Sequence, residues 1–350
     1  MYCLSQEKVD SLLKDVRRAG EACLEIYRQD DFGIQIKSDN SPVTKADLEV
    51  NDILTEALRK LTPDIPIISE EANLPFEERK DYDLFWILDP IDGTKEFIKK
   101  SGEFTLNIGL VENKKPIFGI IYIPVTDEMF WGGRIDDGHK STGIETVDYL
   151  SKKSFVRKKT LDKYIERTQE LIKLKEAAVY TQNFDEAAKL RDQIAEREQL
   201  VQKEAFSEKS YHSALASKKI KVRSLIRMPQ TWRDDYCLDI TCSKDHRHPN
   251  DWEFIKNISL DNHIKLIPCG STIKICRIAE GKADLYIRMS GINDWDLAAG
   301  HAIIEAAGGH VTTLDGRELI YNTEGQRLEP FIVFGAQQLD WTKWAPDESK

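Results

Sequence analysis

Several features that mark other classes of protein are missing from this 350-residue chain. Fifty basic residues against 60 acidic ones leave a formal net charge of −10, without the basic footprint of a duplex-DNA binder. The six cysteines form no CxxC pair, so we expect reduced thiols in a cytoplasmic protein rather than a disulfide framework. No stretch approaches the roughly 18 apolar residues that a membrane span requires. We therefore expect a soluble protein whose partners do not include nucleic acid.

Residues that form turns are missing from the middle of the chain. No proline occurs between Pro124 and Pro229, and glycine is absent over a similar stretch. Within this gap, residues 157–204 are rich in Lys, Arg, Glu, Gln and Ala, which favour helix. The motif YTQNF divides them into two arms. The pattern predicts an αα-hairpin that interrupts the rest of the chain.

Helix and strand patterns flank this gap on both sides. Apolar residues recur at helical spacing over about 5–29 and 44–61, with Ser5 and Thr44 as expected N-caps and Leu48 expected on a buried face. Further helices are expected at 250–258, 272–280 and 295–307, and strands at 65–69, 84–89, 105–111, 116–124, 129–133, 236–241, 264–269, 283–289, 310–314 and 331–335. The predicted domains are an α+β segment (1–135), the insertion (136–205) and an α/β segment (206–350).

The stretch WILDPIDGTKEF places two carboxylates after an apolar strand. Asp89 is expected to end the strand, because Pro90 cannot extend a hydrogen-bonded ladder. Asp92 can then turn to the same side, with the backbone carbonyl of Ile91 between the two carboxylates. Mg²⁺ binds hard oxygen ligands of this kind together with water and phosphate oxygens. The stretch therefore predicts a magnesium site.

Gly93 and Thr94, which follow Asp92, predict a phosphate-binding site beside the metal. Gly93 allows close approach of the backbone, and Thr94 is expected to begin a short helix whose free N–H groups face the metal. An acid-rich turn that merely caps the helix is an alternative of equal weight on local grounds.

Other acidic residues lie at comparable places in the predicted elements, and each is ordinary by itself. Four acid-bearing strand ends or helix starts, none near a His/Cys metal motif, together indicate a cation site made only of oxygen atoms. Besides the first pair, these acids are Glu70 and Glu71 after a strand, Asp294 and Asp296 at a helix start, and Asp47 in the first turn of a helix.

Two segments resemble the signatures of the inositol monophosphatase superfamily of Mg²⁺-dependent phosphatases. DPIDGT at 89–94 resembles the first signature, and WDLAAG at 295–300 resembles the second. The resemblance implies a layered α+β and α/β inositol monophosphatase-like fold, with the hairpin inserted. The segments KEF after the first signature, SGEFTLNIGLV and GSTIKICRIAEGKADLYIR resemble the CysQ-type group. Members of that group are 3'(2'),5'-bisphosphate nucleotidases, linked to sulfate assimilation, that convert adenosine 3',5'-bisphosphate to AMP and phosphate.

The resemblance also implies a role for each matched position. Thr94 and Asp47 would orient the attacking water, Glu71 would lie beside the metals, and Li⁺ would inhibit. Two or three Mg²⁺ ions would be held by Glu70, Asp89, Asp92, Asp296 and the carbonyl of Ile91. Substrate would contact Gly93, Thr94, Gly270, Ser271, Lys274, Arg288 and Asp296, although a capped helix without a substrate role is an alternative for the stretch that contains Gly270 to Lys274.

The inserted segment EAAVYTQNFDEAAKLRDQIAERE at 176–198 resembles the UVR motif. In other proteins this hairpin pairs with protein, so a docking or self-association arm is one hypothesis and a solvated excursion without a partner is the other. Two alternatives to the nucleotidase stay open. One is a phosphatase for inositol phosphate or a sugar phosphate, and the other is a UVR-type binding scaffold. The intact set of acids favours an enzyme over a scaffold.

Overall fold

The structure is a computed structural model of the chain. Residues 1–145 and 217–350 form one compact unit and residues 146–216 form another. The predicted UVR-like hairpin lies outside the described residues and stays a prediction, as do the predicted domain boundaries. The structure describes residues 1–29, 31–37, 41–135, 139–147, 193, 215–218, 237–244, 248–335 and 340–346.

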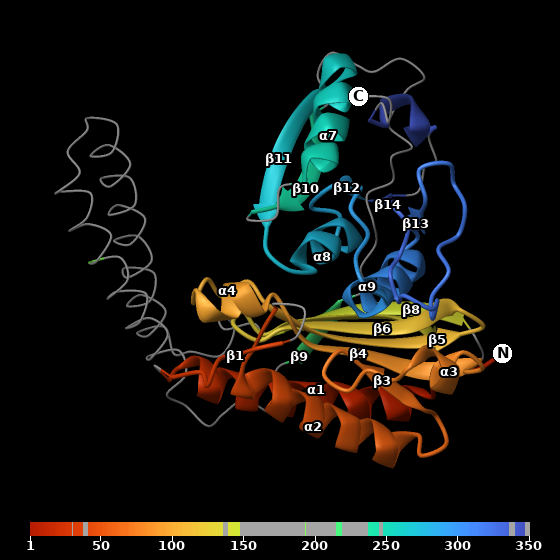
Figure 1. Cartoon of the computed structure of the whole chain (residues 1–350). Helices are drawn as coiled ribbons and strands as arrows, with labels where there is room; N and C mark the ends of the chain where they lie inside the picture. Colours follow the sequence, from red (N-terminus) through yellow and green to blue (C-terminus); the bar gives the residue numbers. More distant parts are fainter. Residues whose placement is uncertain are drawn as a thin grey trace. The chain divides into compact units, whose positions relative to one another are not determined.

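A seven-stranded sheet carries the N-terminal part of the larger unit (Figure 1). Strands β3 and β4 are parallel, and β4 to β7 form an antiparallel meander. The inner strands are almost continuously apolar because helices cover both faces of the sheet. In sheet order the strands are β3 (Ile67–Ser69), β4 (Leu84–Asp92), β5 (Thr105–Glu112), β6 (Lys115–Ile123), β7 (Glu128–Ile135), β8 (His139–Val147) and β9 (Leu215–Lys218).

Helices α1 (Gln6–Tyr27) and α2 (Lys45–Leu61) cover one face of this sheet (Figure 1). The predicted N-caps are confirmed, because the side chains of Ser5 and Thr44 accept backbone N–H bonds at the helix starts. The expected burial of Leu48 is wrong: this side chain is 45% exposed. The chain between the helices forms the two-stranded ribbon β1 (Gln35–Ile36) and β2 (Pro42–Val43).

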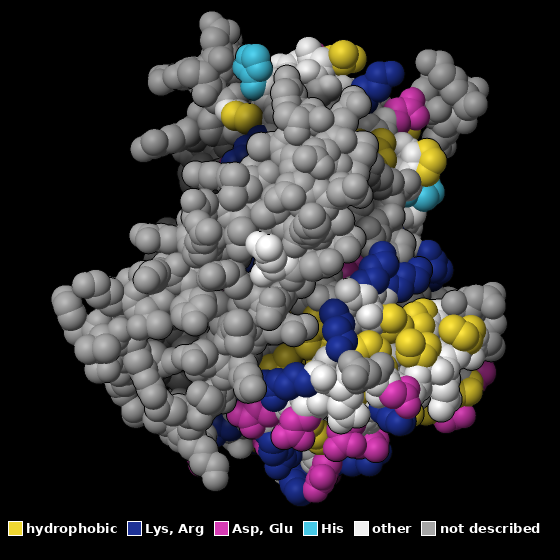
Figure 2. Space-filling view, turned by 90° about the vertical axis from the view of Figure 1, so that its left-hand side faces the viewer, with side chains coloured by type: hydrophobic (Ala, Val, Ile, Leu, Met, Phe, Trp, Pro, Cys, Tyr) yellow, Lys and Arg dark blue, Asp and Glu magenta, His cyan; other side chains and the backbone are white. Residues whose placement is uncertain are grey.

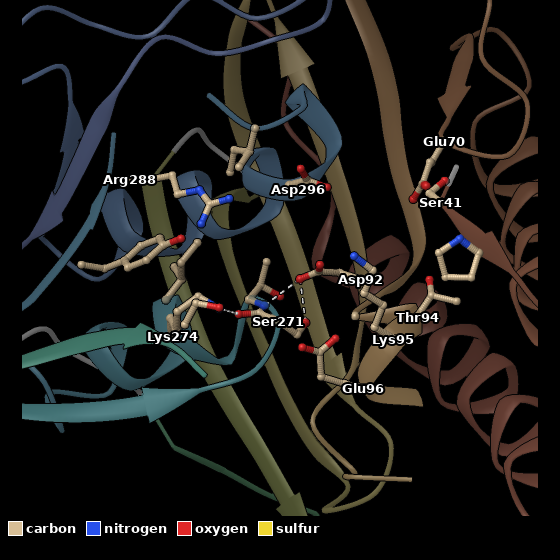
Figure 3. Close-up of a pocket in the computed structure, with 17 residues that line it drawn as sticks. Ser41, Glu70, Asp92, Thr94, Lys95, Glu96, Ser271, Lys274, Arg288 and Asp296 are labelled. Carbon is tan, nitrogen blue, oxygen red and sulfur yellow. Dashed lines mark hydrogen bonds between the residues drawn. The ribbon is translucent and has the colours of Figure 1, made fainter. Parts of the chain in front are cut away.

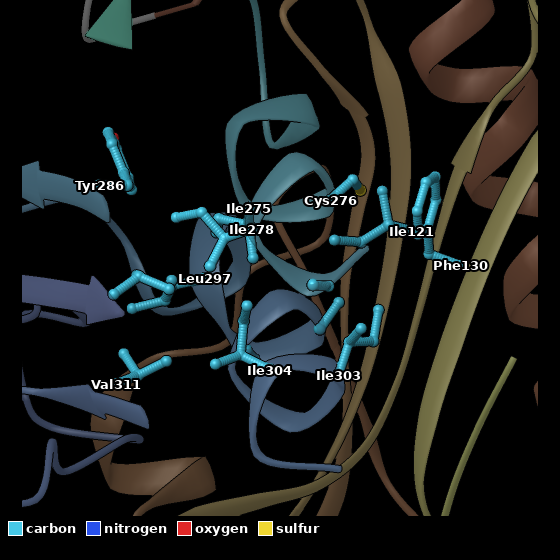
Figure 4. Packing of buried hydrophobic residues seen from close by; sticks show 14 of the residues in the cluster. Ile121, Phe130, Ile275, Cys276, Ile278, Tyr286, Leu297, Ile303, Ile304 and Val311 are labelled. Atoms are coloured by element: carbon cyan, nitrogen blue, oxygen red, sulfur yellow. The ribbon is translucent and has the colours of Figure 1, made fainter. Parts of the chain in front are cut away.

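Helix α9 (Asp294–Ala306) packs on the opposite face, across β4 to β7. A Cβ atom at Gly119 of β6 would lie 2.2 Å from the carbonyl oxygen of Ala299, so only glycine permits this approach. The two isoleucines of α9, Ile303 and Ile304, continue the core toward α8 (Figure 4). Close backbone packing therefore holds α9 against β6.

The C-terminal part of the unit is built on a five-stranded sheet in the order β11-β10-β12-β14-β13. Its first three strands are parallel, and the last two pairs are antiparallel. A second apolar cluster, which includes Phe254 and Trp341, packs against this sheet. The elements are β10 (Cys237–Ser243), α7 (Pro249–Asp261), β11 (His263–Cys269), α8 (Ile273–Ala279), β12 (Leu285–Arg288), β13 (His310–Thr312), β14 (Phe331–Phe334) and η2 (Trp341–Trp344).

Strand β4 continues beyond the end that the sequence predicted, so the expectation that Asp89 ends the strand is wrong. The register shifts between Asp89 and Asp92, and pairing with β5 resumes where Asp92 lies opposite Thr105. This bulge accommodates Pro90, which cannot donate to the ladder. Two short helices complete the unit: α3 (Phe76–Arg79) before β4, and α4 (Thr94–Ile98) after it.

Acidic and basic side chains are interspersed over the described part of the face in Figure 2. Among the helices that the structure describes, none combines the length and the apolar character needed to cross a membrane.

Candidate active site

Three aspartates from two separate elements meet at one side of a cavity. Asp89 and Asp92 lie on the bulged end of β4, and Asp296 lies in the first turn of α9. One carboxylate oxygen from each lies within 4.8 Å of the other two. Figure 3 shows Asp92 and Asp296 facing the same space. This spacing fits oxygens that share one cation or bridge a pair of cations about 3.5–4 Å apart.

The electrostatics of this cluster also favour a cation. Asp89 is 1% exposed, and its Oδ1 atom receives no hydrogen bond from the described residues. Burial raises the pKa of Asp89 and of Asp296 well above the usual range, and the charges of Glu70 and Asp92 raise both further. A buried, unpaired carboxylate among like charges is costly until a positive charge binds there.

Glu70 and Glu71 follow β3 and share a partner that the sequence did not reveal. The Nζ atom of Lys37 lies 2.7 Å from Glu70 Oε1 and 2.7 Å from Glu71 Oε1. Burial opposes the charged form of Lys37, but the two glutamates outweigh it and raise the pKa of the ammonium. Glu70 lines the same cavity as Asp92 and Asp296. An internal cation therefore neutralises part of the acidic site.

Asp47 and Thr94 come from distant elements and contact each other. The Thr94 hydroxyl lies 3.2 Å from Asp47 Oδ1 and 3.2 Å from the carbonyl oxygen of Ile91. The other oxygen of Asp47 accepts from the Thr44 backbone N–H at 2.7 Å and from the Thr44 hydroxyl at 2.6 Å. The capping box of α2 thus fixes the carboxylate that faces Thr94. Gly93 joins β4 to α4 with φ of +91°, a conformation that favours glycine.

Lys274 and Arg288 line the cavity on the side opposite Glu70, and Lys95 lies beside Asp92 (Figure 3). The cavity has a volume of about 270 Å³. Lys274 is buried, donates to the carbonyl oxygens of Cys269 and Ser271, and lies 5.7 Å from the centroid of the Tyr286 ring. Burial lowers the pKa of Lys274. Arg288 donates from Nε to a backbone carbonyl at 3.2 Å. The cavity therefore joins a carboxylate cluster to cationic groups.

The remaining predicted site residues lie where the two sheets approach each other. Ser271 lines the cavity, and its hydroxyl donates to Asp92 Oδ2 at 2.6 Å. The backbone N–H of Gly270 donates to Glu103 Oε2 at 3.1 Å. All the predicted metal, catalytic and substrate residues thus lie in or beside one cavity, and their roles stay predictions. His301, which follows Gly300 in α9, is buried and contacts Tyr321.

The sequence model of the inositol monophosphatase family matches residues 5–217 and 198–330. The chain belongs to the inositol monophosphatase family. It is 29% identical over 323 residues to the 3'(2'),5'-bisphosphate nucleotidase CysQ of Escherichia coli strain K12, covering 92% of this chain and 97% of that protein. The CysQ of Buchnera aphidicola is 30% identical, with 91% and 88% covered.

Solved structures agree with this assignment. The crystal structure of CysQ from Bacteroides thetaiotaomicron, a bacterial member of the family, superposes with a TM-score of 0.63 at 29% identity, covering 95% of this chain and 98% of that one. An IMPase from Thermotoga maritima gives a TM-score of 0.57 at 18% identity, with 95% and 93% covered. The second match supports the fold alone. The predicted inositol monophosphatase-like fold is confirmed.

Proposed function

We propose that this protein is a Mg²⁺-dependent 3'(2'),5'-bisphosphate nucleotidase that converts adenosine 3',5'-bisphosphate to AMP and phosphate. The observation that carries the proposal is a single cavity lined by Asp92, Asp296, Lys274 and Arg288, with the buried Asp89 clustered beside the two aspartates. A substrate with two phosphates requires both a reaction site and a second anion-binding region. Relatives of similar length carry the name of this activity. The reaction would serve nucleotide recycling linked to sulfate assimilation.

The donor set of the site fits Mg²⁺. The candidate ligands are all oxygens, and the unpaired Oδ1 atom of Asp89 is buried among other carboxylates. Bound Mg²⁺ would supply charge neutralisation for the phosphate and lower the pKa of a coordinated water. Two or three ions would be held by Glu70, Asp89, Asp92, Asp296 and the carbonyl oxygen of Ile91.

Residues of the protein would orient the attacking water, accept its proton and bind the two phosphates. Thr94 would orient the attacking water, and Asp47, held by its capping box, would accept a proton through the Thr94 hydroxyl. The turn at Gly93 would bring backbone close to the transferred phosphate. Lys274 and Arg288 would attract the other phosphate from the opposite wall of the cavity. Positioning and charge complementarity would supply most of the rate enhancement.

A comparison of substrates tests the proposed function. We expect kcat/KM for adenosine 3',5'-bisphosphate to exceed that for inositol monophosphate by at least about tenfold, because the latter has no second phosphate for the cationic wall and one charged hydrogen bond is worth about 1.5–3 kcal/mol. Fructose bisphosphate serves as the control with two phosphates but no nucleoside. Phosphate release is measured with Mg²⁺ and after its removal with EDTA.

The other results of this comparison would indicate a different function. Preference for inositol monophosphate or fructose bisphosphate would identify an inositol or sugar phosphatase. Absence of Mg²⁺-dependent turnover on all three compounds would contradict the enzyme and favour a binding scaffold.

Replacing Lys37 tests the effect of the internal cation. We expect Lys37→Gln to tighten the binding of Mn²⁺, used as a probe for Mg²⁺, by about tenfold, because a positive charge beside Glu70 and Glu71 is removed. The metal-free variant should also melt at a lower temperature, since two glutamates lose their partner. Calorimetric titration and thermal unfolding measure these changes. Lys60→Gln, at an exposed pair on α2, is the control. Unchanged or weaker Mn²⁺ binding in Lys37→Gln would contradict the prediction.

A further inference from the structure

Asp92 is anchored to the segment that begins α8, far from it in sequence. Its Oδ2 atom accepts two hydrogen bonds, one from the Ser271 hydroxyl at 2.6 Å and one from the Thr272 backbone N–H at 2.7 Å. Figure 3 shows Ser271 directed at Asp92. With Oδ2 engaged in this way, Oδ1 is the oxygen that can turn to a cation. Asp92 therefore contacts the segment that begins α8 and also belongs to the aspartate cluster.

A chain of buried hydroxyls holds Ser271 in turn. The Thr105 hydroxyl lies 2.6 Å from the Ser271 hydroxyl and 2.6 Å from the Thr272 hydroxyl. Thr105 is fully buried on β5, directly opposite Asp92 in the β4–β5 ladder. The same strand therefore sets both the position of Asp92 and that of its donor.

The backbone at Ser271 adopts a conformation that serine rarely takes. Its φ is +51°, in the left-handed region that glycine enters without steric conflict. A residue kept in this region despite the presence of a side chain points to a role for that side chain. Here the hydroxyl reaches Asp92, which no glycine could do.

The N–H groups at this turn already have carboxylate partners. Gly270 donates to Glu103 Oε2, and Thr272 donates to Asp92 Oδ2. Glu103 is also 2.7 Å from the Nζ atom of Lys244. A phosphate at this place would have to displace both carboxylates. The contacts therefore favour a role within the acidic site over direct binding of a phosphate by these N–H groups.

We propose that Ser271, together with the Thr272 amide, is a positioning residue that fixes Asp92 as a cation ligand. The hydroxyl holds Oδ2 and so leaves Oδ1 directed toward Asp89 and Asp296. The proposal rests on the proposed function, because it takes Asp92 as a ligand of the divalent cation. It also gives Ser271 a function that the sequence did not predict, since substrate contact was expected there.

Two substitutions separate the hydroxyl from the backbone conformation. Ser271→Gly removes the hydroxyl and relieves the left-handed strain, whereas Ser271→Ala removes the hydroxyl and keeps the strain. Mn²⁺ binding to the full-length, metal-free protein is titrated calorimetrically without substrate, and thermal unfolding of the metal-free protein is measured beside it. Ser259→Ala is the control, because Ser259 is exposed on α7 and its hydroxyl bonds only its own helix among the described contacts.

We expect both variants to bind Mn²⁺ about 10–100-fold more weakly than the unsubstituted protein, as is typical when a group that orients a ligand is lost. The metal-free Ser271→Gly protein should melt no lower than the parent, so that weaker binding cannot follow from a weaker fold. Mn²⁺ affinity within about threefold of the parent in Ser271→Gly would overturn the proposal; the threefold limit is about 0.65 kcal/mol. If Ser271→Gly does not fold, the same limit applies to Ser271→Ala. Failure of the unsubstituted protein to bind Mn²⁺ would instead refute the proposed function.

Discussion

Asp89→Asn is expected to lower Mg²⁺-dependent phosphatase activity at least about 10³-fold while making the metal-free protein more stable. Activity falls because a buried candidate ligand is lost. Stability rises because one member of a set of repelling carboxylates becomes neutral. We expect an increase in Tm of about 2–4 °C without metal. Phosphate release and thermal unfolding with and without Mg²⁺ measure both effects.

Because activity should fall while metal-free stability rises, the experiment distinguishes the loss of a metal ligand from damage to the fold. A substitution that simply damaged the fold would lower activity and stability together. Asp83→Asn is the matched control, because Asp83 is exposed immediately before the same strand and should change neither quantity. Near-normal turnover of Asp89→Asn would show that the cluster is not the reaction site. A large loss of metal-free stability would show that Asp89 is charged and paired in some other way.

Arg79→Met is expected to lower the free energy of unfolding by about 2–4 kcal/mol, because several buried acceptors lose a charged donor. Arg79 is 2% exposed on α3 and donates to the loop that follows β13 in the chain. The bonds reach the Asn322 side chain at 2.6 Å, the Thr323 carbonyl at 2.9 Å and the Glu324 carbonyl at 2.9 Å. Methionine preserves much of the volume but none of these donors, so the buried acceptors lose their partners.

Denaturant unfolding in the absence of metal measures this loss. Arg59→Met, at an exposed position of α2, should change the free energy of unfolding by less than about 0.5 kcal/mol. Arg79→Met should also disturb the first turn of α9, which bears Asp296. The link is Asn322, whose backbone N–H donates to Asp294 Oδ2 at 2.6 Å. A loss below about 1 kcal/mol in Arg79→Met would mean that the loop finds other partners or is held without Arg79.

Much of the fold could be predicted from local sequence patterns. Helical periodicity and the caps Ser5 and Thr44 gave the limits of α1 and α2 to within a few residues, because capping and amphipathic burial are local effects. The segment from Asp89 to Thr94 likewise predicted a turn from strand to helix with carboxylates at its start. Which acids converge was predicted through resemblance to a family, since Asp296 lies far along the chain from Asp89.

The features that were missed depend on contacts between distant segments. The bulge that carries β4 past Pro90 requires β5 as a partner, whereas the rule that proline ends a ladder considers one strand alone. Lys37 shows no motif, and only the folded ribbon brings it to Glu70 and Glu71. Leu48 is exposed because other residues of α2, among them Leu54 and Leu58, form its buried face. Tertiary packing decides each of these cases.

Strands β8 and β9 are neighbours in the seven-stranded sheet, and residues 148–214 connect them along the chain. In the sheet order, β5, β6 and β7 lie between β8 and the strand that bears Asp89. The entropy of closing a loop grows only with the logarithm of its length, so such a junction tolerates growth. The length of this connection can therefore vary while the strand that bears Asp89 keeps its neighbours β3 and β5.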